Sequence, residues 1–197
     1  MNKKLLIALV AIVSIISFAR SFLGVMGIIP WHYGYSDIFN EDRINPASAF
    51  KIPYIERQVE YPVITGFFIY FMWLFGKSLL GYVLLSFIFL TAFAIITALS
   101  LHKLMDILKI DKKQLFWFFI FAPSLIFFGI YNWDIIAVMF MVLAMYFFYK
   151  NSYGWGALFL SFGFNAKLFP IIILPIILLK VNFKQGIKIL TIFLLAS

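Results

Sequence analysis

The chain has 197 residues, of which 64% are hydrophobic and only 12% are charged, and its mean hydropathy is +1.03. These values exclude an ordinary soluble domain and predict an integral membrane protein. A net charge of +8 would suggest nucleic-acid binding in a soluble chain, but the basic residues stand in small groups between apolar runs, as membrane anchors do. The lack of cysteine excludes disulfides and thiolate sites.

The first apolar run, residues 5–29, has the charged start of a signal peptide, with Lys3 and Lys4 before it. No cleavage site of small residues follows, and the apolar character resumes after Arg20, so we predict an uncleaved first membrane span. We expect the Arg20 side chain to extend toward the lipid headgroups, with a functional charge as the alternative.

A polar loop and a short apolar segment come next. The loop, residues 33–62, holds five of the eight carboxylates of the protein: Asp37, Glu41, Asp42, Glu56 and Glu60. Residues 61–76 are apolar, but as a helix they reach only about 24 Å, and a bilayer core is about 30 Å thick. We predict that this segment stays on the outer side, in or dipping into the outer leaflet, with Tyr61, Tyr70 and Trp73 at the interface.

Further apolar runs fill the remainder of the chain. The candidate spans are residues 79–101, 115–131, 135–149, the pair 155–164 and 168–179, and 187 onward. The pair could form one helix with Lys167 buried, but that would reverse the side on which the following lysines lie. We therefore favour two half-spans that meet at an outer turn, since broken helices at membrane depth line cavities.

The lysine distribution orients these spans. The positive-inside rule assigns the N-terminus and the polar stretch 102–114 to the cytoplasm, which requires that residues 61–76 do not cross. The motifs at 131–134 and 165–167 then lie outside. The lysines expected inside are Lys3, Lys4, Lys103, Lys109, Lys112, Lys113, Lys150, Lys180, Lys184 and Lys188.

Together these features predict an all-α polytopic protein of the cell membrane, with a cytoplasmic N-terminus and about six or seven transmembrane or half-spanning helices. Its single transmembrane domain, 1–197, has an outer catalytic-type loop and surface helix at 30–78 and a helix bundle at 79–197. Because the chain stops within an apolar run, we expect the bundle to be incomplete at its C-terminal end, with a short final helix that ends at Ser197 as the alternative.

Three stretches resemble the integral-membrane glycosyltransferases of the C-type superfamily, and above all the mannosyltransferases that use polyprenol-phosphate mannose. The first is "SDIF" at 36–39 with "IPYIERQVEYPVITGFFIYFMWLFG" at 52–76. The others are "YNWDIIAVMFMVLAMYFFYK" at 131–150 and "LSFGFNAKLFPIIILPIIL" at 160–178. The chain departs from the family at Val63, which stands in place of a second proline, and in having about half the usual number of spans.

The resemblance implies that a sugar, expected to be mannose, moves from a polyprenyl-phosphate donor to a lipid or glycan acceptor on the outer face, with inversion. The phosphate leaves as an anion and needs a cation, whereas the acceptor hydroxyl needs one general base. Asp37 occupies the place of the family's loop aspartate and is the expected base, with a helix cap as the alternative. Glu60 is the second candidate, for the base or for acceptor binding, against a solvated loop charge.

Other polar residues are expected to hold the substrates. Lys167, between apolar half-helices, is the main candidate for the donor phosphate, with a snorkelling anchor as the alternative, and Arg57 is a weaker candidate. We expect Trp133 to stack on the sugar ring. The remaining residues expected to bind sugar or acceptor are Tyr61, Asn132 and Asp134, although an aromatic belt and a helix N-cap explain the 132–134 motif equally.

Some residues are expected to have local or no chemical roles. The acids Glu41, Asp42 and Glu56 lie beside Arg43 and Arg57, and ion pairs explain them. His32 and His102 are predicted on opposite sides, so the sequence indicates no metal site, and we expect no cofactor. The expected partners are the lipid-linked donor, the acceptor and membrane lipids.

Two other functions fit parts of the pattern. A non-catalytic or truncated membrane subunit would explain the short chain, and a lipid or solute transporter would explain a broken helix. Transporters commonly repeat such breaks in two halves, and this chain has one broken pair. The identity of the sugar and of the acceptor does not follow from these residues.

Overall fold

The computed structural model describes residues 2–30, 36–39, 49–129 and 132–197. Every secondary structure element in these ranges is helical, which confirms the predicted fold class at this level. Two helices are long and apolar enough to cross a membrane, α1 (Lys3–Val25) and α6 (Leu79–Leu108). Helix α1 begins where the side chain of Asn2 accepts a hydrogen bond from the Lys4 N–H at 2.9 Å, a typical N-cap.

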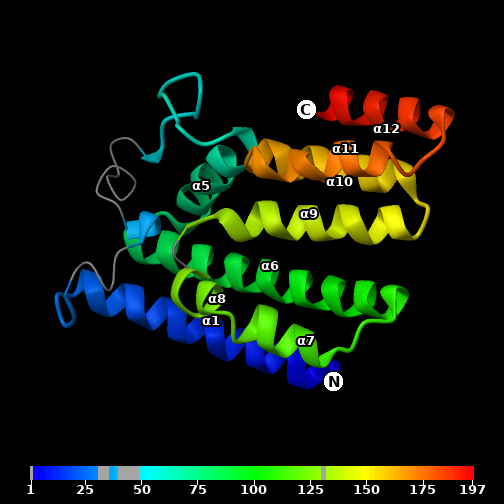
Figure 1. The fold of residues 1–197 in the computed structure, drawn as a ribbon. Helices are drawn as coiled ribbons and strands as arrows, with labels where there is room; N and C mark the ends of the chain where they lie inside the picture. Colours follow the sequence, from blue (N-terminus) through cyan, green and yellow to red (C-terminus); the bar gives the residue numbers. More distant parts are fainter. Residues whose placement is uncertain (1, 31–35, 40–48, 130–131) are drawn as a thin grey trace.

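The predicted surface segment forms α5 (Val63–Gly76), which is steeply inclined to the long helices and packs on α6 (Figure 1). The chain turns sharply between the two, through Lys77 at φ 55°. Gly81 is required at this corner, because a Cβ atom there would lie 2.1 Å from the Gly76 carbonyl oxygen. The buried rings of Trp73 and Tyr82 stack at 4.8 Å and hold α5 against α6.

Helix α6 is longer than the predicted span 79–101, because it continues through the polar stretch to Leu108. Its 30 residues extend about 45 Å, beyond the thickness of a bilayer core. His102 and Met105 are buried on the additional turns, and the Lys112 ammonium pairs with the Asp106 carboxylate at 2.5 Å. The hydropathy of the sequence did not predict these additional turns, because they are stabilised by packing and are not apolar in composition.

The predicted span 115–131 is not one helix, which corrects the sequence-based expectation. It consists of α7 (Lys113–Leu115), the π-helical turn η2 (Phe116–Ile120) and α8 (Pro123–Phe128). Pro123 has no N–H to donate, and its ring would clash with the preceding turn, so the helix restarts at this residue.

Arg20 also differs from its expected role as a headgroup anchor. Its guanidinium donates to the carbonyl oxygen of Phe127 at 2.6 Å and to the Ser21 hydroxyl at 3.3 Å. The Phe127 carbonyl lies in the last turn of α8, where carbonyl groups lack partners within the helix. Arg20 therefore joins α1 to α8 as a structural contact.

The second half of the chain forms two helical hairpins, of which the first packs on α6 through α9 and the second packs on α10 through α12. The elements are α9 (Asp134–Tyr149), α10 (Tyr153–Ala166), η3 (Phe169–Ile172), α11 (Ile173–Leu178) and α12 (Phe183–Ala196). The predicted break in 155–179 is confirmed, because α10 ends at Ala166, the backbone at Lys167 is extended, and η3 returns along α10. Gly163 allows this return, since a Cβ atom there would lie 3.2 Å from Pro170.

The lysine-rich segments all lie at one end of the bundle (Figure 1). This end carries the N-terminus and the connections α6–α7, α9–α10 and α11–α12. Its lysines approach one another, since the Lys103 and Lys150 ammonium groups lie 5.8 and 5.4 Å from the Tyr146 ring centroid. The segment order predicted from charge therefore agrees with the arrangement of the helices.

Candidate functional site

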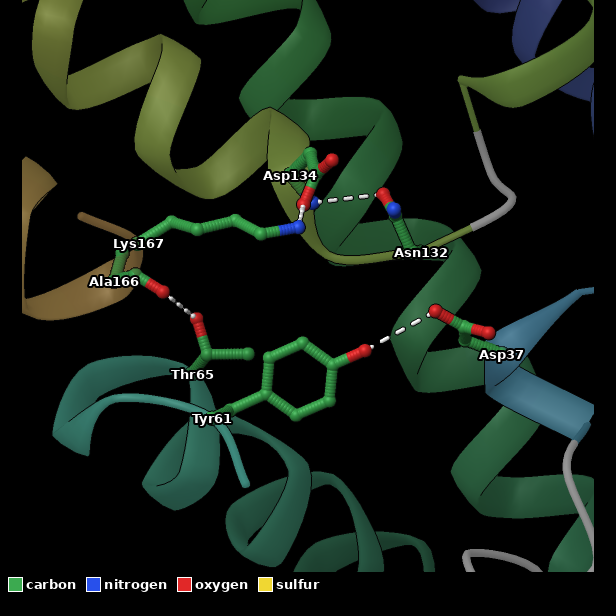
Figure 2. Close-up of polar contacts among 7 residues, drawn as sticks. All are labelled: Asp37, Tyr61, Thr65, Asn132, Asp134, Ala166 and Lys167. Atoms are coloured by element: carbon green, nitrogen blue, oxygen red, sulfur yellow. Dashed lines mark hydrogen bonds and ion pairs between the residues drawn. The ribbon is translucent and has the colours of Figure 1, made fainter. Parts of the chain in front are cut away.

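The opposite end of the bundle gathers the predicted site residues from four separate parts of the chain (Figure 2). It comprises the short helix η1 (Asp37–Phe39), the start of α5, the start of α9 and the break after α10. These parts meet because α1 ends there, α5 lies across that end, and the hairpin of α9 and α10 opens toward it (Figure 1).

Asp37 and Tyr61 form the first contact of the site. The Tyr61 hydroxyl donates to Asp37 Oδ2 at 3.1 Å, and both side chains are half-buried. The turn of η1 is held instead by Ser36, whose buried hydroxyl oxygen accepts from the Ile38 N–H at 3.3 Å. The cap role considered for Asp37 thus belongs to Ser36, and the Asp37 carboxylate faces the tyrosine.

Trp133 packs against Tyr61, and the Trp133 side chain is only 1% exposed. The two rings meet edge to face, with centroids 5.4 Å apart. A sugar ring therefore has no access to the indole face, and the predicted stacking of Trp133 on a sugar is wrong for this arrangement. The indole instead supports Tyr61, since aromatic rings in this geometry attract each other.

Asn132 has a local role at the start of α9. Its side-chain oxygen accepts from the Asp134 N–H at 3.0 Å, which satisfies one of the free amides of the first helical turn. Trp133 stands at the N-cap position and makes no side-chain cap, so Asn132, one residue earlier, supplies the side-chain oxygen for this amide at the helix start. Asp134 is the first residue of α9, where the positive end of the helix dipole favours a carboxylate.

Asp134 and Lys167 form an ion pair between α9 and the break after α10. The side chains remain 42% and 37% exposed. The Lys167 ammonium therefore reaches across the site to a carboxylate (Figure 2), and this contact does not support the alternative of a headgroup anchor. The pair carries both a cation for a phosphate and an acceptor for a hydroxyl.

Thr65 fixes the position of the break, and sequence reasoning did not identify it. Its buried hydroxyl donates to the Ala166 carbonyl oxygen at 2.7 Å, directly before Lys167 (Figure 2). The last carbonyl groups of a helix lack partners within it, so this bond stabilises the end of α10. The available signal was a polar residue within an apolar run, which indicates an interhelical hydrogen bond.

The loop before α5 is a compact turn built on Tyr54, which has φ 65°. Its hydroxyl donates to the Tyr61 carbonyl oxygen at 2.7 Å and rests on Gly66. Burial raises the pKa of the Tyr54 hydroxyl, and the positive charge of Arg57 partly opposes this rise. The turn thus fixes the backbone of Tyr61 next to Asp37.

The remaining predicted site residues of the loop lie in or next to the turn built on Tyr54. Glu60 is exposed and Arg57 is half-buried. Glu56 accepts from the Ile52 N–H at 2.6 Å, so its carboxylate contributes to the turn. The expected partners Glu41, Asp42 and Arg43, together with His32, lie outside the described residues.

The arrangement combines a tyrosine-bound carboxylate with a separate, solvent-accessible ion pair. Trp133 connects them, because it packs on Tyr61 and directly precedes Asp134. Such a site can accept a proton at one point and bind an anion at another. No family model, curated protein or solved structure matches this chain.

Proposed function

We propose that this chain is a multi-pass membrane protein, with the lysine-rich end in the cytoplasm and the site-bearing end outside. The proposal is supported by the two span-length helices and by the gathering of the lysine-rich segments at one end of the bundle (Figure 1). Exposed apolar side chains such as Ile12, Ile15 and Ile16 on α1 suit contact with lipid. Helix α5 then remains on the outer side, as its inclination suggests.

We further propose that the site transfers a sugar, expected to be mannose, from a polyprenyl phosphate to a lipid or glycan acceptor. The observation that carries this proposal is the contact between Asp37 and Tyr61, set beside the Asp134–Lys167 pair. The chemistry needs a carboxylate base and a cation, and these side chains supply both. The resemblance of the same segments to the C-type glycosyltransferases supports the same reaction.

Asp37 is the base in this proposal. The acceptor hydroxyl gives its proton to the carboxylate while its oxygen attacks the anomeric carbon from the side opposite the phosphate. The bond between the anomeric carbon and the phosphate oxygen breaks, and the phosphate keeps the electron pair, so the configuration inverts. Tyr61 positions the carboxylate by donating to Oδ2, which leaves Oδ1 to receive the proton.

Lys167 stabilises the departing phosphate. In the structure its ammonium group is paired with Asp134, so an incoming phosphate has to compete with that carboxylate. An exposed pair contributes at most about 1 kcal/mol, and a charge-assisted bond to phosphate contributes more, about 1.5–3 kcal/mol. The exchange therefore favours the phosphate, and it releases Asp134 to accept a hydrogen bond from the sugar.

The loop residues have secondary roles, one toward the acceptor and one toward the donor phosphate. Glu60 is the reserve candidate for the base and the more direct candidate for acceptor binding, because it is exposed and precedes Tyr61. Arg57 is placed by the same turn and is a secondary candidate for phosphate. Neither residue is required by the minimal reaction of one base and one cation.

The experiment is a transfer assay with the purified full chain in lipid vesicles. Radiolabelled polyprenyl-phosphate mannose is added with a membrane lipid extract as the source of acceptor, and product is followed by extraction. Label in a new lipid or glycan product supports the proposal, and polyprenyl-phosphate glucose tests the choice of sugar. Donor binding without transfer would favour a non-catalytic subunit, and movement of label across the bilayer without transfer would favour a transporter.

A further inference from the structure

A groove lies between the start of α10 and α12. Both helices start at the lysine-rich end of the bundle, opposite the site described above (Figure 1). The volume of the groove is about 580 Å³, within the usual range of about 300–1,000 Å³ for ligand sites. The polar lining comes from Asn151, Ser152 and Lys188, and the apolar lining from Trp155, Leu158 and Ile192.

The lining changes from polar to apolar along the helices. Asn151 and Ser152 precede α10, whereas Leu158 lies about 7.5 Å farther along its axis than the first residue. On α12, which starts at the same end, Ile192 lies one turn deeper than Lys188. A molecule with a polar head and an apolar tail fits this order, with the head toward the lysine-rich end.

The charges around the polar mouth favour an anion. Lys188 lines the groove, and Lys150 directly precedes Asn151. Lys180 lies 6.0 Å from the ring centroid of Tyr149, which holds a third ammonium group at this end. Positive charges on short connections next to a bilayer attract the headgroups of acidic lipids.

Gly154 and Trp155 shape the groove itself. A Cβ atom on Gly154 would lie 3.6 Å from Ile192 Cδ1 and 3.8 Å from Lys188 Cε, so α12 approaches α10 closely at this point. Trp155 is 58% exposed, and tryptophan favours the interface between headgroups and hydrocarbon. The indole therefore forms an apolar wall beside the polar mouth.

We infer that this groove binds an anionic phospholipid of the cytoplasmic leaflet, with its phosphate near Lys188 and an acyl chain along Trp155, Leu158 and Ile192. This inference rests on the membrane insertion and orientation proposed above, but not on the proposed sugar transfer. It identifies a second lipid site, at the other end of the bundle from the donor.

The test measures quenching of Trp155 fluorescence by phospholipids with brominated acyl chains, using the full chain in vesicles. Trp31→Phe and Trp117→Phe are introduced first, so that Trp155 is the exposed indole, since Trp73 and Trp133 are 1% exposed. We expect brominated phosphatidylglycerol to bind at Trp155 about fivefold more tightly than brominated phosphatidylcholine. Lys188→Gln should remove this preference.

Lys184→Gln is the matched control, because Lys184 is also an exposed lysine of α12 but does not line the groove. This variant should keep the preference nearly unchanged. An equal loss in both variants would overturn the proposed site and indicate a general surface charge effect. Displacement of the brominated lipid by millimolar glycerol phosphate would also overturn it, in favour of a soluble anion. Quenching by neither lipid would instead contradict membrane insertion.

Discussion

The ammonium group of Lys167 and the carboxylate of Asp134 form an ion pair although the residues stand 33 positions apart in the sequence. The pair exists because α10 ends directly before Lys167 and Thr65 binds the carbonyl of Ala166, the last residue of the helix. Since both side chains are more than a third exposed, the pair contributes little to folding stability. Its larger consequence concerns binding, because a charged ligand can separate the two side chains at low cost.

The first prediction concerns this exchange and uses polyprenyl phosphate without a sugar as the ligand. Lys167→Met should weaken binding of the lipid phosphate by about tenfold to a hundredfold, since it removes one charge-assisted contact, and Lys167→Arg should retain part of the affinity. Asp134→Asn should strengthen binding up to about fivefold, because the carboxylate no longer competes for the ammonium group. Weaker binding in Asp134→Asn would contradict the exchange.

The second prediction concerns the base. Asp37→Asn keeps the size of the side chain and removes its basicity, so transfer should fall by about 10² to 10⁴ while donor binding is unchanged. Folding should be unaffected, because Ser36 holds the η1 turn. Initial rates and donor affinity are measured on the same preparation. Near-normal turnover would remove Asp37 from the mechanism and make Glu60 the leading candidate.

The third prediction tests the positioning role of Tyr61. Tyr61→Phe removes the hydrogen bond to Asp37 but keeps the ring that packs on Trp133. The turnover rate should fall by about two- to tenfold, the effect of one ordinary hydrogen bond. Donor affinity should stay unchanged, because Tyr61 contacts the base and not Lys167. A loss of donor affinity in parallel with the rate would indicate a structural role alone.

The fourth prediction concerns the topology. The chain has no cysteine, so single cysteines at Lys77 and Gln114, both exposed, can be labelled without background. An impermeant thiol reagent added to intact cells should label position 77 and leave position 114 unlabelled until the membrane is opened. Labelling of position 114 but not of position 77 from outside would contradict the orientation and place α5 across the membrane, and equal labelling or equal protection of both would contradict α6 as a span.

The fifth prediction concerns the turn that fixes Tyr61. A Cβ atom on Gly66 would lie 2.0 Å from the Tyr54 hydroxyl oxygen, so Gly66→Ala displaces this ring and breaks its bond to the Tyr61 carbonyl. The apparent Tm in detergent should fall by about 2–10 °C, as expected from about 1–3 kcal/mol of overpacking. Gly154→Ala is the control, since its methyl group meets atoms at ordinary distances of 3.6 and 3.8 Å.

The sequence determined which parts of this chain are apolar and helical. Apolar runs identified α1, α6 and α9, and the length of residues 61–76 indicated a short, separate helix. The lysine pattern predicted which connections lie at one end, and the arrangement in Figure 1 agrees with that order. These properties depend on local composition, because the cost of placing polar groups in hydrocarbon is set residue by residue.

Local composition could not determine where some helices break or continue. Hydropathy predicted one span over residues 115–131, but a new helix, α8, begins at Pro123 within this run. Helix α6 continues past its apolar part because His102 and Met105 are buried against neighbouring elements. A hydropathy value is an average over many residues. A helix break can depend on a single missing backbone N–H, and the extension of a helix can depend on the contacts of a few side chains.

Only the tertiary structure determined which polar residues meet. In the structure, Ser36 caps η1, the buried Trp133 ring packs on Tyr61, and Asp134 pairs with Lys167. Each of these outcomes depends on how helices distant in the chain are rotated and stacked, which a single sequence does not encode in any local pattern. The sequence therefore identified most of the residues at the site, and the packing of α5, α9 and α10 determined their partners.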